Sequence, residues 1–216
     1  GQECVHHLRG MFSFAIWDEK KKIFFAAVDR LRIKPFYFTQ SGNSFVFASE
    51  LKAIVASGLF KAELNFEAIH HFLSMQAVPV PMTIYENVFT LPGGYALKIV
   101  DGAVSVYQYW DMKFEIQDGY SEHFYKQKVR DLIAEAVELR LMSDVPLGAF
   151  LSGGIDSSII VALMNEIQSD PIRTFTIGYD IGGLEWDDTR YAKLIAEKYQ
   201  TQHTVQVVTA RDVLDE

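Results

Sequence analysis

The sequence predicts two parts of different fold class, an antiparallel α+β part over residues 1–112 and a parallel α/β part over residues 113–216. Short β-type runs separated by turn residues dominate residues 11–50, and a hairpin pattern follows near residue 100. Beyond residue 120, helix and strand patterns alternate, which is typical of a parallel sheet with right-handed crossovers. A charged, glycine-containing stretch at residues 113–119 separates the two patterns.

The composition is that of an ordinary globular protein, with 49% hydrophobic and 22% charged residues in a chain of 216. The formal net charge of −8 argues against nucleic acid as a partner, because nucleic-acid binders concentrate Lys and Arg. No apolar run has the length of a membrane span, so no membrane partner is expected. The single cysteine, Cys4, excludes an internal disulfide and favours a cytoplasmic location.

Four β-type runs open the chain, at residues 11–17, 23–28, 35–39 and 45–48. Their order and the short turns between them predict an antiparallel meander. The runs are apolar at both alternating sets of positions, so we expect the sheet to be covered on both faces.

Two helices and a hairpin complete the first part. The first helix covers residues 51–56 and stops at Gly58, and the second covers residues 65–74 with Asn65 as its N-cap. Residues 77–92 contain three prolines and are expected to be irregular. The runs 94–100 and 104–109 flank Asp101-Gly102, which predicts a hairpin with an Asp-Gly turn.

The second part opens with an amphipathic helix at residues 124–142, followed by a continuously apolar, buried strand at residues 145–151. A helix at 157–167, a strand at 173–179, a helix at 188–200 and a strand at 204–208 follow. Asp187-Asp188 is interpreted as the N-cap of the last helix.

The segment Ser152-Gly153-Gly154-Ile155-Asp156-Ser157-Ser158 joins a strand to a helix through two glycines. Glycines let backbone N–H groups approach an anion closely, and a helix N-terminus adds unpaired donors and partial positive charge. The serine hydroxyls are further donors, and Asp156 could help hold a magnesium ion on a pyrophosphate. The pattern therefore predicts a phosphate-binding loop.

This loop is not a Walker A loop, because no G-x-x-x-x-G-K-[ST] motif occurs. The alternative is an ordinary Gly-Gly turn in which Asp156 or Ser157 caps the helix. The buried strand before the loop and its two extra serines favour the phosphate site.

The loop resembles the pyrophosphate loop of the PP-loop ATP pyrophosphatases, which activate a carboxylate or carbonyl by adenylation. The lead-in at residues 140–148, Arg-Leu-Met-Ser-Asp-Val-Pro-Leu-Gly, is similar to glutamine-hydrolysing asparagine synthetases in particular. Further similar segments lie at residues 8–18, 29–37, 47–53, 81–85 and 91–94. The resemblance thus covers nearly the whole chain.

The resemblance implies an N-terminal nucleophile-type glutaminase remnant with a bridge over residues 1–112 and a Rossmann-like synthetase domain over residues 113–216, both truncated. It implies ATP and Mg²⁺ as cofactors, aspartate and glutamine as further substrates, and a homodimer as one expected assembly. The adenine would be contacted by main chain near Phe150, Leu151 and Ile177. The pyrophosphate would be bound by residues 152–158. The activity implied is conversion of aspartate to asparagine, with glutamine-derived ammonia, through β-aspartyl-AMP.

Both chain ends are interpreted as cuts within a longer protein, so the chain on its own is expected to be inactive. In the resembled enzymes the glutaminase nucleophile is the mature N-terminal cysteine, a position that Cys4 does not occupy. Cys4 is therefore expected to be a partly buried structural residue.

Two positions depart from the family pattern. Val28 stands where the family usually has arginine, and Arg32 where it usually has glycine. An arginine favours negative φ, so the departure predicts a changed turn geometry at Arg32.

The acceptor substrate stays open at this point. Related amidotransferases of secondary metabolism or surface polysaccharide pathways keep the fold and use other acceptors. A nucleotide-binding module without catalysis is the third hypothesis.

Overall fold

The computed structural model describes residues 1–180, 188–209 and 211–212 of the chain. The chain divides into two compact units, residues 1–115 and residues 116–216. Sheets in the first unit are antiparallel and the sheet in the second is parallel, so the chain combines the two classes of sheet that the sequence predicts. Within the described ranges, no helix is long and apolar enough to cross a membrane.

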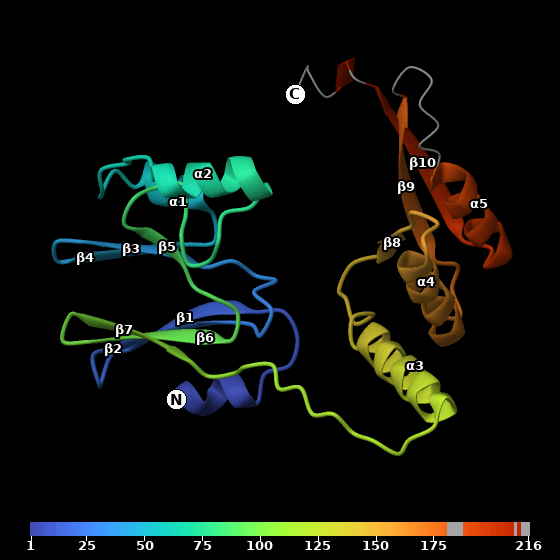
Figure 1. The fold of residues 1–216 in the computed structure, drawn as a ribbon, viewed down its shortest axis with the longest axis horizontal. Coiled ribbons are helices and arrows are strands. Elements are labelled where there is room, and N and C mark those ends of the chain that lie inside the picture. Colours follow the sequence, from blue (N-terminus) through green and yellow to red (C-terminus); the bar gives the residue numbers. More distant parts are fainter. Residues whose placement is uncertain (181–187, 210, 213–216) are drawn as a thin grey trace. The chain divides into compact units, whose positions relative to one another are not determined.

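The first unit contains two antiparallel sheets. One has the order β1-β2-β6-β7, formed by β1 (Ser13–Asp18), β2 (Ile23–Val28), β6 (Tyr95–Val100) and β7 (Ala103–Gln108). The other has the order β4-β3-β5, formed by β3 (Tyr37–Ser41), β4 (Ser44–Ala48) and β5 (Val88–Thr90). Figure 1 shows the two sheets as stacked layers, with α1 (Leu51–Ala56) and α2 (Phe66–Met75) beyond the second sheet and the 3-10 helix η1 (Gln2–His6) beyond the first.

Strand β2 is buried on both faces, as its continuous apolar run predicts. Ala26 and Val28 belong to a core between the two sheets, which also contains Phe36. Phe25 and Ala27 point to the opposite face, where Val5 of η1 packs against them. Because both alternating sets of side chains are removed from water, every position of the strand gains from being apolar.

The predicted single meander over residues 11–50 is wrong, because β1-β2 and β3-β4 are hairpins of different sheets. Between them the chain crosses from one sheet to the other around Asp29, which is 1% exposed. Its carboxylate accepts backbone N–H bonds at 3.0–3.3 Å from residues 12, 31, 33 and 34. A buried carboxylate with four donors determines the path of the chain more strongly than turn propensity does.

The same loop overturns the expectation of negative φ at Arg32, whose φ is +54°. The amides of Leu31 and Ile33 both donate to Asp29 Oδ1, at 3.1 and 3.0 Å. The backbone N–H of Arg32 donates to the Asp29 carbonyl at 3.1 Å. These bonds hold a left-handed residue where the side chain alone would disfavour one.

Local capping signals are confirmed. The Asn65 side chain accepts from the amide of Ala68 at 3.0 Å and begins α2. Asp101 and Gly102 both have positive φ, +50° and +79°, as a primed hairpin turn requires. The predicted irregular segment nevertheless contains β5, a strand too short to be seen as a pattern, which pairs with β3.

The second unit alternates helices and parallel strands. Its elements are α3 (Glu122–Glu138), β8 (Gly148–Phe150), α4 (Ile155–Ile167), β9 (Arg173–Asp180), α5 (Asp188–Lys198) and β10 (Gln202–Thr209). The sheet order is β10-β9-β8, with parallel pairing on both sides of β9. Of the predicted cap Asp187-Asp188, Asp187 lies outside the described residues, and Asp188 is the first residue of α5.

Strand β8 is shorter than predicted, beginning at Gly148 instead of residue 145. Among the described residues, β8 pairs only with β9, and Gly148 lies opposite Arg173, the first residue of β9. Residues before Gly148 therefore have no described strand beside them to pair with. Val145 is 67% exposed, so its apolar character does not mark a buried strand.

Candidate phosphate-binding site

The candidate loop leaves the sheet at the carboxyl end of β8. Leu151, 1% exposed, donates its backbone N–H to the Phe175 carbonyl at 2.8 Å, and the chain then turns away toward α4. Ligands of open parallel sheets lie beyond the carboxyl ends of the strands. The fold therefore brings the predicted loop to the edge where a ligand is expected.

The two glycines of the loop have different roles. Gly153 has φ +77°, and a β-carbon there would lie 2.5 Å from the backbone nitrogen of Ala192 on α5. Gly154 has an ordinary φ of −68°, and a β-carbon there would meet only Ser152 Oγ, at 3.4 Å. Gly153 is thus required by the close approach of α5, while Gly154 leaves open space at the helix start.

The N-terminus of α4 carries no side-chain cap. Its N-cap is Gly154, not Asp156 or Ser157, so the alternative of an ordinary capped turn is wrong in this respect. The first helical bond joins the Ser158 N–H to the Gly154 carbonyl at 3.1 Å. The amides of residues 155–157 precede that bond and have no partner within the helix. By contrast, α2 and α3 are capped by the side chains of Asn65 and Ser121.

The hydroxyl groups of the loop are bonded to the loop itself with unequal strength. Ser152 Oγ and Ser157 Oγ are 3.1 Å apart, and Ser157 Oγ also accepts the Ser152 N–H at 3.3 Å. Ser158 Oγ donates to the Gly154 carbonyl at 2.7 Å. Because the first two contacts are long, Ser152 and Ser157 can exchange them for an anion more readily than Ser158 can.

Asp156 and Ile155 lie in the first turn of α4 with exposed side chains, Ile155 at 79%. No group of three or more His, Cys, Asp or Glu side chains suited to a metal occurs in residues 1–180, 188–209 and 211–212. A carboxylate oxygen nevertheless suits Mg²⁺, which usually takes one or two protein carboxylates and completes its shell with water and phosphate oxygens. The residues present fit a metal held largely by a bound pyrophosphate.

Two of the three predicted adenine contacts, Phe150 and Ile177, lie on one face of the sheet. Phe150 is opposite Phe175 in the β8–β9 register, and Ile177 is two residues further along β9 on the same side. Phe150 is 76% and Ile177 46% exposed, so both offer apolar surface near the loop. Leu151 faces the other way into the α4–α5 core and offers only its main chain.

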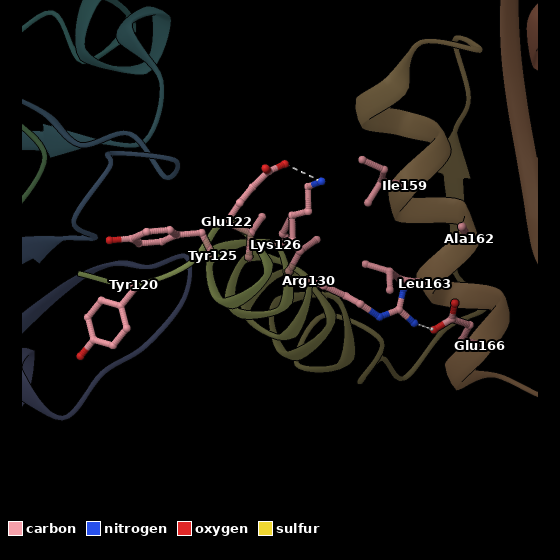
Figure 2. A pocket seen from close by; sticks show the side chains of 11 residues that line it. Tyr120, Glu122, Tyr125, Lys126, Arg130, Ile159, Ala162, Leu163 and Glu166 are labelled. Carbon is pink, nitrogen blue, oxygen red and sulfur yellow. Dashed lines mark hydrogen bonds and ion pairs between the residues drawn. The ribbon is translucent and has the colours of Figure 1, made fainter. Parts of the chain in front are cut away.

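A cavity of about 800 Å³ lies between α3 and α4. Figure 2 shows charged side chains paired across and beside it, Arg130 with Glu166 and Lys126 with Glu122. These ion pairs measure 2.6 Å each, so the charged groups satisfy one another. The remaining lining is mostly aliphatic and aromatic, and the cavity holds no residue of the predicted loop.

Cys4 lies in η1. Its side chain is partly buried and packs against the core cluster of Val5, Phe25, Ala27 and Ala96. These core residues of η1 and the first sheet give Cys4 a packing environment.

The structure brings a further residue to the loop, Thr176, which was not among the residues predicted from the sequence. Its hydroxyl donates to the Leu151 carbonyl at 2.5 Å, and the side chain is 4% exposed. The available signal was a polar residue at an inward position of β9, between the outward Phe175 and Ile177. A polar side chain at such a position needs a hydrogen-bond partner.

Comparison with known proteins assigns a family to each unit. Residues 1–110 match the glutamine amidotransferase domain family, and residues 128–216 match the asparagine synthase family. A putative glutamine-hydrolysing asparagine synthetase of Methanocaldococcus jannaschii is 36% identical over 98% of this chain and 41% of its own length. The glutamine-hydrolysing asparagine synthetase 3 of Bacillus subtilis is 33% identical over 99% of the chain and 37% of its own length.

A relative with a different name is amidase chry2 of Gibberella zeae, 34% identical over 77% of the chain and 25% of its own length. The chain spans about two fifths of the length of the two synthetases. The family matches cover both units, and the synthetase relatives align with nearly all of the chain. These similarities show that the chain belongs to the family of glutamine-hydrolysing asparagine synthetases.

Proposed function

We propose that residues 152–158 bind the pyrophosphate part of ATP in an enzyme that converts aspartate to asparagine with ammonia derived from glutamine. The observation that carries this proposal is the uncapped start of α4, which follows Gly153 at the carboxyl end of a parallel strand. Three amides without helical partners and two weakly held hydroxyls converge there. Such a concentration of donors at a helix N-terminus suits a phosphate anion.

The chemistry divides into two steps. A carboxylate oxygen of aspartate attacks the α-phosphorus of ATP, and pyrophosphate leaves with the electron pair of the broken P–O bond. Ammonia then attacks the acyl carbon of β-aspartyl-AMP, gives up a proton and expels AMP. Donors from residues 155–157 and the Ser152 and Ser157 hydroxyls would stabilise the charge that develops on the leaving pyrophosphate.

The other assignments follow from this role. Asp156 would help to hold Mg²⁺, which neutralises pyrophosphate charge when it is bound. Phe150, Leu151 and Ile177 would border the adenine. Residues 1–112 would belong to the glutaminase domain and its bridge, and residues 113–216 to the synthetase domain. With this role, the enzyme would be cytoplasmic and would assemble as a homodimer.

A second candidate keeps the nucleotide chemistry and changes the acceptor. The similarity to a protein named as an amidase favours keeping this alternative, because that protein aligns with 77% of the chain. In this case the activated carboxylate would belong to another molecule, in secondary metabolism or surface polysaccharide synthesis.

ATP–pyrophosphate exchange in the full-length protein tests the proposal. Exchange that depends on aspartate supports asparagine synthesis, and exchange that requires another carboxylate supports the second candidate. Nucleotide binding without exchange for any carboxylate would indicate a nucleotide-binding module without catalysis. An enzyme whose exchange is unchanged by substitution of residues 152–157 would refute the loop assignment.

A further inference from the structure

The loop is attached to the sheet by a side chain at the point where the β8–β9 ladder ends. Leu151 makes the last backbone bond of the ladder, through its N–H to the Phe175 carbonyl at 2.8 Å. In a regular parallel ladder, the carbonyl of the same residue would accept the next backbone amide of the neighbouring strand. Instead, the Leu151 carbonyl accepts the hydroxyl of Thr176 at 2.5 Å.

Burial makes this bond necessary. Leu151 is 1% and Thr176 is 4% exposed, so water does not replace the hydroxyl easily. A buried carbonyl without a donor is costly, and the cost is avoided only while the carbonyl points at Thr176. The bond therefore fixes the orientation of the Leu151 peptide, and the next residue of the chain is Ser152, the first residue of the loop.

We propose that Thr176 is a positioning residue for the phosphate loop, acting through the Leu151 peptide without touching the ligand. This inference rests on the proposed nucleotide-binding function. The hydroxyl determines the direction in which residues 152–154 leave the sheet. It thereby sets where the open start of α4 presents its amides.

Thr174 supplies a matched control on the same face of the same strand. It is fully buried, and its hydroxyl lies 2.7 Å from Thr201 Oγ1 and 2.9 Å from His203 Nδ1. Thr174→Val therefore removes a buried hydroxyl of the same strand without touching the Leu151 carbonyl. Both valine variants should lower thermal stability, but only Thr176→Val should change the loop.

The first test measures binding of Mg-ATP to the 216-residue chain by calorimetry. Thr176→Val is expected to weaken binding about tenfold, as loss of a well-placed buried hydrogen bond can. Thr176→Ser, which keeps the hydroxyl, and Thr174→Val should bind within about twofold of the unaltered chain. Unchanged affinity in Thr176→Val, or an equal loss in Thr174→Val, would overturn the proposal.

The second test needs no ligand and separates this inference from the proposed function. Amide hydrogen exchange at Gly153 and Gly154 should be faster in Thr176→Val than in Thr174→Val or Thr176→Ser. If the unaltered chain does not bind ATP, the nucleotide assignment fails while this comparison still decides the positioning role. Equal exchange at the two glycines in both valine variants would refute that role.

Discussion

A β-carbon on Gly153 would lie 2.5 Å from the backbone nitrogen of Ala192. The backbone of α5 therefore packs directly against Gly153, the first glycine of the loop. Gly153 also has a left-handed conformation, with φ +77°. Its neighbour Gly154 meets no such constraint. This difference separates packing from ligand binding in experiments on the loop.

Gly153→Ala should destabilise the second unit by about 3 kcal/mol, because the new methyl group clashes with α5 and a left-handed alanine is strained. Thermal or urea denaturation of the chain measures the change. Gly119→Ala is a suitable control, because Gly119 also has positive φ, +97°, but nothing lies within 4 Å of its added β-carbon. Equal losses in the two variants would show that the α5 contact contributes nothing.

Gly154→Val should leave stability within about 1 kcal/mol of the unaltered chain, because its φ of −68° is open to any residue. The branched side chain would, however, cover the uncapped start of α4. We expect the affinity for ATP to fall at least tenfold in calorimetry, roughly 1.4 kcal/mol or more. A normally folded variant with unaltered affinity would argue that no phosphate approaches this residue.

Asp156→Ala should reduce aspartate-dependent ATP–pyrophosphate exchange in the full-length protein by about tenfold or more, because a carboxylate that supports the metal is lost. Binding of the nucleotide should weaken less than turnover, since the backbone donors remain. Asp131→Ala on α3 removes another exposed carboxylate of the same unit and should leave exchange unaltered. Full exchange in Asp156→Ala would exclude the metal-supporting role.

Asp29→Asn should destabilise the first unit by about 3 kcal/mol. The asparagine side chain carries no negative charge and cannot accept all four of the backbone N–H bonds that the carboxylate accepts. Burial raises the pKa of Asp29, but the amides of Ile33, Lys34, Leu31 and Phe12 outweigh it, and the pKa is lowered overall. A carboxyl group with a lowered folded pKa stabilises the protein above its unfolded pKa, and that contribution is lost as pH falls through the folded pKa.

The unaltered chain should therefore lose stability below about pH 4, and Asp29→Asn should lose less over the same interval. Melting temperatures between pH 3 and pH 7 provide the measurement. Asp18→Asn, at a turn where the carboxylate accepts two amides, should cost much less stability. Identical acid profiles for the Asp29 variant and the unaltered chain would contradict this account.

Arg32→Gly should stabilise the first unit by about 0.5–1 kcal/mol, because glycine adopts the φ of +54° without strain. It also removes a buried guanidinium nitrogen, Nη1, that has no hydrogen-bond partner. Lys34→Gly in the same loop has no left-handed backbone to relieve and should destabilise. Denaturation of both variants measures the change in their free energy of unfolding. Destabilisation by Arg32→Gly would contradict the strain argument.

Local signals in the sequence predicted most elements. Asn65 begins α2 and Asp101-Gly102 turns a hairpin, because both act through bonds or dihedral angles within a few residues. The alternation of strands and helices after residue 120 likewise predicted the parallel sheet. Strand β5 and the length of β8 were not predictable in this way, since each depends on which strand lies alongside.

The candidate site was predictable in part. The motif at residues 152–158 identified the segment, because two glycines and a helix start are local features. Its supports were not visible, because Ala192 and Thr176 reach the loop from α5 and β9. Pairings over such sequence distances leave no short-range pattern.

By itself, the sequence determined the family, the two classes of sheet and the place of residues 152–158 between a strand and a helix, because these depend on motifs and on hydrophobic periodicity. Only the tertiary structure decided that residues 11–50 divide between two sheets around the buried Asp29. It alone gave the two adjacent glycines different roles, one against α5 and one open at the helix start. The physical reason is that burial and close packing belong to surfaces brought together from distant parts of the chain, which local propensity does not encode.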